Sequence, residues 1–236
     1  GEPIAVALTA RYLYGAPGAD LQGEVELLVR AAERPFPWAE GWAFGLVQEP
    51  FLPTALPLAA IVTDAEGTAR LDLEPPDAPD TTAPLELLAR LRVFDVDGRP
   101  VTAEAVAPWR IAEHLIGVRP RFAGDLPEQA EAGFDVRLVD AAGRPAGPGS
   151  LGYELIREDW DYVWFRTGGR WEWERVVTER RVEAGELAVG VDGTAALTLR
   201  ADAGRWRLEV FTADGRAATS VRFDAGFWAD GVERER

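Results

Sequence analysis

The chain has 236 residues, of which 47% are hydrophobic and 28% charged, the balance of a folded protein with one large domain or two of ordinary size. Its 25 basic and 40 acidic residues give a net charge of −15, and a surface of this sign repels nucleic-acid phosphates and anionic membranes. Nucleic acid is therefore not an expected partner. The absence of cysteine excludes disulfides, thiolate metal sites and a cysteine nucleophile.

The sequence contains no methionine, so Gly1 is not an encoded start. We expect the chain to be a mature product or a piece excised from a longer protein. No run of 18 or more apolar residues occurs, and no segment has the make-up of a signal peptide. Membrane contact is therefore expected only through an anchor outside this chain.

Turn signals recur at short intervals, because aspartate bonds its own backbone and glycine accepts a positive φ. They stand at residues 64–67, 95–98, 140–143, 192–193 and 214–215. Between the turns, apolar and polar residues alternate with the period of two that half-buried strands have, as in Ile4, Val6 and Leu8. Patterns of helical period are scarce, so the chain is predicted to be all-β.

The first half of the chain contains about seven predicted strands, the number of an antiparallel immunoglobulin-like sandwich. They cover residues 4–12, 24–30, 42–47, 58–63, 68–73, 85–94 and 101–111. The strands predicted in the second half cover residues 116–122, 133–139, 152–157, 162–166, 170–177, 195–200, 205–212 and 219–223. We therefore predict two consecutive β-sandwiches, at residues 1–114 and 115–236.

Two short stretches support a relation between these halves. FDVDGRPV and LVDAAGRPA both have a strand followed by Asp-x-x-Gly-Arg-Pro. This similarity indicates either two related modules or one turn chemistry that is used twice.

Residues that could carry out catalysis do not form a recognisable set. His114 is the only histidine, and a Ser-His-Asp arrangement would need it close to Ser150 or Ser220, the only serines. No glycine-rich phosphate-binding pattern occurs. We predict no catalytic residue, no cofactor, no metal and no enzymatic activity, and we interpret His114 as a structural or solvated residue.

Acidic residues two apart on a strand point the same way and could suit a glycosidase or a calcium site, as in Asp159 with Asp161 or Glu172 with Glu174. The second pair alternates with tryptophans, however, as the wet face of a half-buried strand does. Asp95-Val-Asp97-Gly98 also lacks the spaced ligands of a calcium loop. We interpret these carboxylates as surface and turn residues.

The most distinctive stretch is WDYVWFRTGGRWEWER, residues 160–175, in which a Thr-Gly-Gly-Arg turn joins two aromatic strands. One interpretation is a packed face with an aromatic ladder across the strands, which the alternating Arg and Glu residues favour. The alternative is an exposed platform that stacks on sugar rings. Its residues would be Trp160, Tyr162, Trp164, Trp171 and Trp173.

An ordered set of landmarks resembles the macroglobulin-like modules of bacterial α2-macroglobulins along nearly the whole chain. The landmarks are ARYLYGAPGADLQGEVEL, WAFG, TDAEGTARLDL, VDGRPV, HLIGVRPRF, LVDAAGRP, GRWRLEVF and DAGFW. On this resemblance Tyr12 and Tyr14 are strand residues, and residues 15–17 turn the chain toward the next strand.

The resemblance implies a function that the composition does not show. Members of the family are large envelope proteins, often lipid-anchored in the periplasm, that entrap proteases after a bait segment is cut. Many then capture the protease through a thioester, which needs a Cys-x-Glu-Gln motif that this cysteine-free chain lacks. The chain is therefore expected to be a non-catalytic scaffold fragment. Its expected partners are neighbouring macroglobulin-like domains and, through the full-length parent, target proteases.

Two finer assignments follow. A bait-like segment is predicted in ERVVTERRVEAGEL, residues 174–187, where Arg175, Arg180 and Arg181 offer trypsin-type cleavage sites. Alternatively, the valines of this segment simply continue a strand. The rival function is a carbohydrate-binding or adhesive module that uses the aromatic platform, and the expected location is the periplasm or cell envelope, with a lipid-anchored inner-membrane parent.

Overall fold

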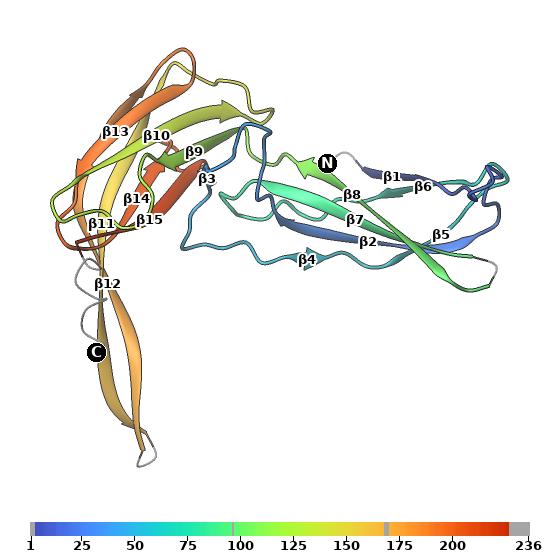
Figure 1. The fold of residues 1–236 in the computed structure, drawn as a ribbon, viewed down its shortest axis with the longest axis horizontal. Coiled ribbons are helices and arrows are strands. Elements are labelled where there is room, and N and C mark those ends of the chain that lie inside the picture. Colours follow the sequence, from blue (N-terminus) through green and yellow to red (C-terminus); the bar gives the residue numbers. More distant parts are fainter. Residues whose placement is uncertain (1–2, 96, 168–169, 227–236) are drawn as a thin grey trace. The chain divides into compact units, whose positions relative to one another are not determined.

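The computed structural model describes residues 3–95, 97–167 and 170–226, except for the side chains of residues 161–163, 165, 167 and 172–176. None of the described residues is helical, and their paired strands are all antiparallel. The all-β prediction is confirmed. The chain forms two compact units, each a pair of facing sheets (Figure 1).

Unit 1 comprises residues 1–35, 51–80 and 84–111. Its small sheet pairs β1 with β6, and its large sheet has the order β4-β2-β7-β8, with β5 also paired to β2. The strands are β1 (Ile4–Thr9), β2 (Gln22–Ala31), β4 (Thr54–Ala55), β5 (Ala59–Val62), β6 (Thr68–Leu73), β7 (Leu85–Phe94) and β8 (Pro100–Trp109).

The core of unit 1 follows the alternation seen in the sequence. Every second residue of β2 from Gly23 to Val29 is buried. Val25 and Leu27 lie in this core, and half-buried Val6 and Leu8 of β1 pack against it from the small sheet.

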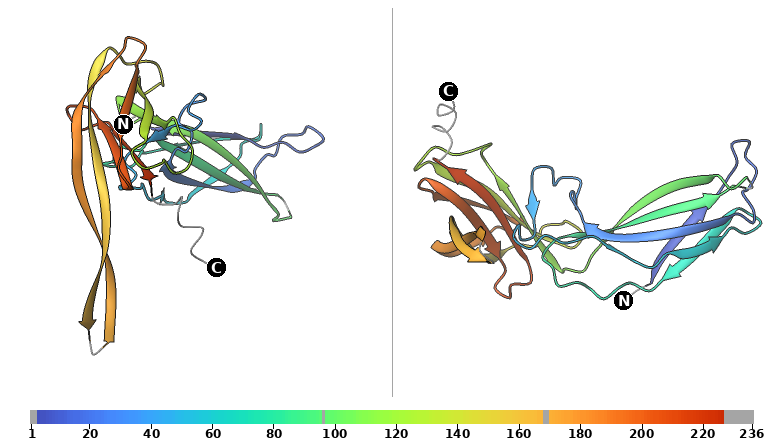
Figure 2. Two further views of the ribbon diagram at one scale, coloured as in Figure 1. Left: turned by 60° about the vertical axis from the view of Figure 1, so that its left-hand side comes forward. Right: turned by 90° about the horizontal axis from the view of Figure 1, so that it is seen from below.

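Unit 2 comprises residues 36–50, 81–83 and 112–236. Its sheets have the orders β13-β10-β9-β3 and β12-β11-β14-β15 (Figure 2). The strands are β3 (Ala43–Phe44), β9 (His114–Pro120), β10 (Glu131–Asp140), β11 (Gly149–Thr167), β12 (Arg170–Val189), β13 (Thr194–Arg200), β14 (Gly204–Phe211) and β15 (Ala218–Ala225).

Unit 2 has the larger core. Phe134, Leu155, Leu208 and Val210 have no exposed surface. Phe134 and Phe223 approach each other from opposite sheets, with ring centroids 5.5 Å apart. The two sheets of unit 2 therefore pack closely over one continuous apolar layer.

One predicted strand belongs to the other unit. Residues 42–47 were assigned to the first sandwich, but β3 pairs with β9 in unit 2. The reason is hydrophobic burial, since Phe36, Trp38 and Phe44 pack against Leu115 and Val139. Residues 36–50 thus leave unit 1 and complete a sheet of unit 2.

The turns after β1 and β10 are built alike. In each, a backbone amide donates to the carbonyl four residues later, from Tyr12 at 2.9 Å and from Asp140 at 2.8 Å. In each, a glycine takes a positive φ, 92° at Gly15 and 80° at Gly143, which glycine adopts without steric cost.

Two sequence interpretations change here. Tyr12 and Tyr14 were expected on a strand, but β1 ends at Thr9 and both tyrosines lie in the turn, with their rings stacked 5.4 Å apart. FDVDGRPV lies between β7 and β8, whereas LVDAAGRPA follows β10. These two stretches share their turn chemistry but not their position in the module.

Candidate functional site

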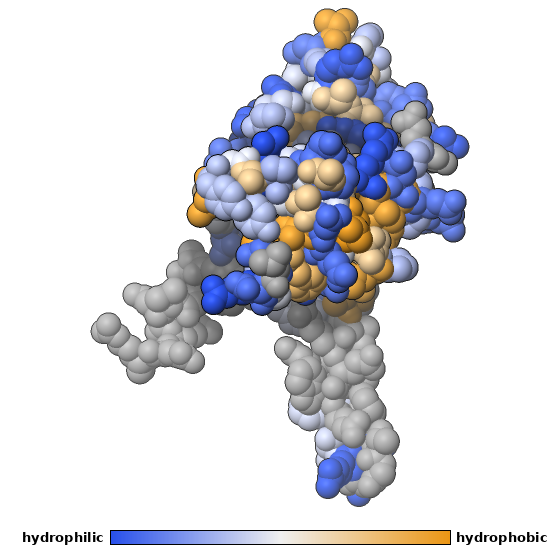
Figure 3. All heavy atoms as spheres, turned by 90° about the vertical axis from the view of Figure 1, so that its right-hand side faces the viewer, coloured by the Kyte–Doolittle hydropathy of each residue, from blue (hydrophilic) through white to orange (hydrophobic). Residues whose placement is uncertain are grey.

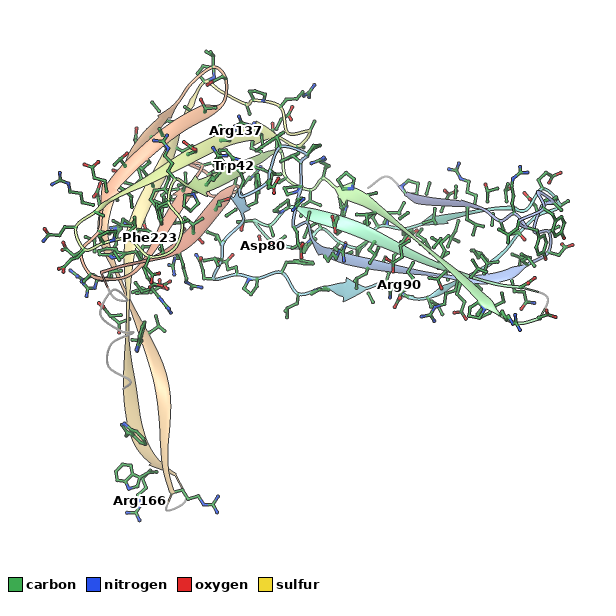
Figure 4. All side chains as sticks on the ribbon, in the orientation of Figure 1. Trp42, Asp80, Arg90, Arg137, Arg166 and Phe223 are labelled. Carbon is green, nitrogen blue, oxygen red and sulfur yellow. The ribbon has the colours of Figure 1, made fainter. Side chains whose placement is uncertain are left out.

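The hairpin of β11 and β12 extends beyond the sandwich that carries it (Figures 1 and 2). β14 pairs with β11 only from Gly152 to Glu158, because β14 begins at Gly204. Residues 159–178, which we call the ribbon, continue as two paired strands in which Trp164 lies opposite Trp173. Arg166 lies at the far end of the ribbon (Figure 4).

The described tryptophans of the ribbon face solvent. The exposed fraction is 61% for Trp164 and 68% for Trp171, and Trp160 is also exposed. The guanidinium of Arg205 lies 5.0 Å from the centre of the Trp160 ring. The interpretation as a buried face is therefore wrong for these three residues, because no second sheet in the described part of the chain covers the ribbon. The side chains of the other two platform residues, Tyr162 and Trp173, lie outside the described part.

A buried ion network at the base of the ribbon joins all four strands of the sheet β12-β11-β14-β15. Arg207 of β14 and Glu158 of β11 are only 4% and 5% exposed. Arg207 donates to Glu158 (Nη1 to Oε1, 2.6 Å) and to both oxygens of Glu179 on β12 (2.6 and 2.8 Å). Arg222 of β15 donates from Nε to Glu158 Oε2 at 2.9 Å.

The hydrogen bonds between Arg207 and Glu179 favour the charged forms of these two groups. The hydrogen bond from Arg207 lowers the pKa of the Glu179 carboxyl, and the same bond raises the pKa of the guanidinium. Each buried charge thus faces an opposite one, which burial requires. We call this ion network the clamp, because its ion pairs hold β11 and β12 to β14 and β15 at the point where the ribbon leaves the sheet.

Sequence reasoning did not identify this network. Glu158 and Glu179 lie 21 positions apart in the sequence, and their pairing depends on the register of the hairpin. A signal was present in Arg207 itself, which alternates with apolar neighbours on a buried strand. Such a residue needs a buried anionic partner.

The three arginines of the predicted bait-like segment all lie in β12. Arg181 is exposed and forms an ion pair with Glu154 at 2.7 Å. Arg180 is exposed opposite Arg157, and the backbone of Arg175 lies opposite Tyr162, with its side chain outside the described part. The alternative that these residues continue a strand agrees with the structure. Protease cleavage at these residues stays a prediction.

A second cluster escaped the sequence analysis. The guanidinium of Arg137 lies 4.8 Å from the ring centre of Trp38 and 5.3 Å from that of Trp42, and Arg119 lies 4.9 Å from Trp42 (Figure 4). Arg119 also donates to Asp135 at 2.8 Å, which lowers the pKa of that carboxyl. A groove of about 370 Å³ adjoins this cluster. These stacked cations hold residues 36–50 on the sheet of unit 2.

The other predicted residues form no assembled centre. Within the described ranges, no group of three or more His, Asp or Glu side chains could hold a metal ion. His114 is half-buried at the start of β9. A search of the same residues finds no helix with the length and apolar character to cross a membrane.

Two family models match consecutive parts of the chain. The model described as the bacterial α2-macroglobulin MG5 domain matches residues 1–110. The model described as bacterial macroglobulin domain 6 matches residues 117–227. Together they cover nearly the whole chain.

Known proteins agree with the models. An α2-macroglobulin of Xylella fastidiosa is 30% identical over 213 residues, which are 89% of this chain but 13% of that protein. The native conformation of E. coli α2-macroglobulin is 26% identical with a TM-score of 0.78, over 95% of this chain and 15% of that one. E. coli α2-macroglobulin activated by porcine elastase is 28% identical with a TM-score of 0.76, over 96% of this chain and 21% of that one. The chain thus spans a small part of the length of these relatives, and it belongs to the bacterial α2-macroglobulin family.

Proposed function

We propose that the chain supplies two non-catalytic scaffold modules to an α2-macroglobulin that entraps proteases at the cell envelope. The observation that carries the proposal is the match of two successive macroglobulin models, at residues 1–110 and 117–227, to a chain that folds into two compact β-sandwiches. The solved E. coli relative activated by porcine elastase supports a protease as the partner of the parent protein. The parent is proposed to be lipid-anchored and periplasmic, which fractionation of the producing cells will test.

The proposed role of the modules is mechanical. Sandwiches with close-packed cores resist deformation, so they can hold the cleaved and capturing regions of the parent in register. They then transmit the rearrangement that follows cleavage. X-ray scattering of the full-length parent before and after protease treatment tests this role. An unchanged profile after complete cleavage would contradict it.

The bait-like assignment of Arg175, Arg180 and Arg181 has its own test. Hydrogen-bonded strands must open locally before a protease can bind them, so we expect trypsin to cut first near the ends of the ribbon strands, at Arg166 or Arg170. Limited digestion with mass-spectrometric mapping distinguishes the sites. Rapid, selective cleavage at the three predicted arginines would support a bait in this chain, and resistance there would place the bait elsewhere in the parent.

A second function is a glycan-binding platform, which the exposed rings of Trp164 and Trp171 favour. Titration with peptidoglycan fragments should then quench tryptophan fluorescence. Replacement of both residues by alanine should abolish the quenching, whereas Leu13→Ala, at an exposed residue of unit 1, should leave it intact. A flat titration of the natural chain would eliminate this function.

A further inference from the structure

The two units repeat one module, and their hydrogen-bond registers establish the correspondence. In unit 1, β1 pairs with β6 from Ile4↔Leu73 to Thr9↔Thr68. In unit 2, β10 pairs with β13 from Glu131↔Arg200 to Arg137↔Thr194, which is one pair more. The turns that follow β1 and β10 also match, with bridges Arg11↔Pro17 and Val139↔Pro145. β1 and β6 are therefore the counterparts of β10 and β13.

The two modules differ at one edge. β10 has a second neighbour, β9, which pairs antiparallel with it from Phe134↔Pro120 to Asp140↔His114. Among the strands that the structure describes, β1 pairs with β6 alone. The other edge of β1 therefore presents backbone donors and acceptors without a strand partner.

The opposite sheet shows the consequence. The β7–β8 pair starts at Phe94↔Pro100 and the β14–β15 pair at Phe211↔Ala218, so β8 is the counterpart of β15. Almost all of β15 is buried, whereas almost all of β8 is exposed. Thr219 is 1% exposed and its counterpart Val101 is 65% exposed.

β9 and residues 45–48 together cover β15, since the amides of Gly45 and Val47 donate to Thr219 and Ser220. The hydroxyl of Thr219 donates to the carbonyl of Ile116 on β9 at 2.6 Å. Val221 and Phe223, the next inward residues of β15, are buried in the same core as Ile116. In unit 1 the corresponding inward positions hold Val101, Ala103 and Ala105, all exposed.

A groove lies where the counterpart of β9 would be. It measures about 590 Å³ and runs between β1 and β8. In the space-filling view of this end of unit 1, hydrophobic residues reach the surface among hydrophilic ones (Figure 3). The apolar side chains that line the groove include Leu8, Leu21, Leu91, Val93, Val101 and Ala103, and Arg11, Tyr12 and Asp95 also line it.

We propose that this groove accepts one extended β-strand, which pairs antiparallel with the free edge of β1 at Val6–Thr9 and covers β8. The occupant is the polypeptide that precedes residue 1 in the full-length protein, because β9 precedes β10 in unit 2. It carries apolar side chains at alternate positions, which lie over Val101, Ala103 and Ala105. The Xylella relative, of which this chain matches 13%, has ample further chain to supply such a strand. The proposal does not depend on protease entrapment.

Hydrogen exchange tests the proposal. The chain 1–236 is compared with the same chain preceded by its natural upstream polypeptide, long enough to span the distance from His114 to Glu131 in unit 2. We expect amide exchange in β1 and β8 to slow by about tenfold or more in the longer form. Exchange in β10 and β15 should not change. Equal exchange of β1 and β8 in the two forms would overturn the proposal.

A matched pair of variants makes the test specific. Ala103→Arg should leave the melting temperature of the chain 1–236 unchanged, because this side chain faces open space there. In the longer form it should remove the added protection of β1 and β8. Thr102→Arg, on the other face of β8, should have no effect in either form. A loss of stability from Ala103→Arg in the short form, or protection that survives it in the long form, would contradict the proposal.

A second copy of the chain could fill the same groove, and sedimentation equilibrium separates this outcome. The upstream strand predicts that the chain 1–236 is monomeric, with fast exchange in β1 at every concentration. A dimer whose formation protects β1 and β8 would overturn the assigned occupant.

Discussion

β8 and β15 occupy the same place in two copies of one module, yet one is open to solvent and the other is buried. Their inward residues differ accordingly, with Ala103 and Ala105 where unit 2 has Val221 and Phe223. The inward residues of such a strand are buried only where a strand of the opposite sheet lies across them. Where β9 lies across β15, large residues fill a core, and where no described strand crosses β8, small residues line a groove.

The largest expected difference between the units concerns the core position that Phe134 and Val6 share. Phe134 is fully buried against Phe223, so Phe134→Ala should cost about 3–5 kcal/mol of the stability of unit 2. Val6 is only half-buried, so Val6→Ala should cost unit 1 about 1 kcal/mol. Hydrogen exchange of peptides from each unit measures both losses. Equal losses of stability in the two variants would mean that the core of unit 1 is packed as closely at this position as the core of unit 2.

The next largest difference between the units is the stability lost when one partner of an ion pair is removed. Removing one partner of a buried pair leaves an uncompensated charge, so Glu158→Gln should cost unit 2 about 3 kcal/mol. In unit 1, Arg90 pairs with Glu104 on an exposed face, and Glu104→Gln should leave stability unchanged within error. Urea denaturation of both variants is the measurement. A tolerated Glu158→Gln would show that the network does not hold the base of the ribbon.

The matched turns offer a third comparison. Alanine at either glycine must adopt a positive φ, which costs about 1 kcal/mol. At Gly15 an added Cβ meets nothing, whereas at Gly143 it would collide with the ring of Phe36. Gly143→Ala should therefore cost about 2 kcal/mol, and Gly15→Ala about half as much. Thermal unfolding measures both variants. A larger loss of stability for Gly15→Ala than for Gly143→Ala would contradict the prediction.

Much of the fold was readable from the sequence because it depends on local alternation. Val25, Leu27 and Val29 are buried at every second position of β2, as their spacing predicts. The Asp-Gly turns likewise separate most of the strands where expected, since their conformation depends on a few adjacent residues. The all-β class therefore followed from short-range patterns alone.

The remaining features depend on partners far away in the chain. Phe36 and Trp38 are apolar enough to predict burial, but their sequence does not reveal that β9, about 80 residues later, is their support. The tryptophans of the ribbon alternate as on a half-buried strand, yet Trp160, Trp164 and Trp171 are exposed, because β14 pairs no farther along β11 than Glu158. The sequence of β11 does not indicate where its neighbour β14 begins or ends.

The smallest expected effect is an acid sensitivity that the ion network at the base of the ribbon adds to unit 2. The folded pKa of Glu179 is lowered by its hydrogen bond from Arg207, so its stabilising contribution is complete above the unfolded pKa, about 4.3. The contribution is lost as the pH falls through the lower, folded value. Glu179 is partly exposed, so solvent screening keeps the effect modest. Glu179→Gln should therefore flatten the fall in the melting temperature of unit 2 between pH 5 and pH 3, whereas Glu186→Gln, an exposed position on the same strand, should not. An unchanged slope in Glu179→Gln would mean that the clamp at the base of the ribbon does not depend on this charge.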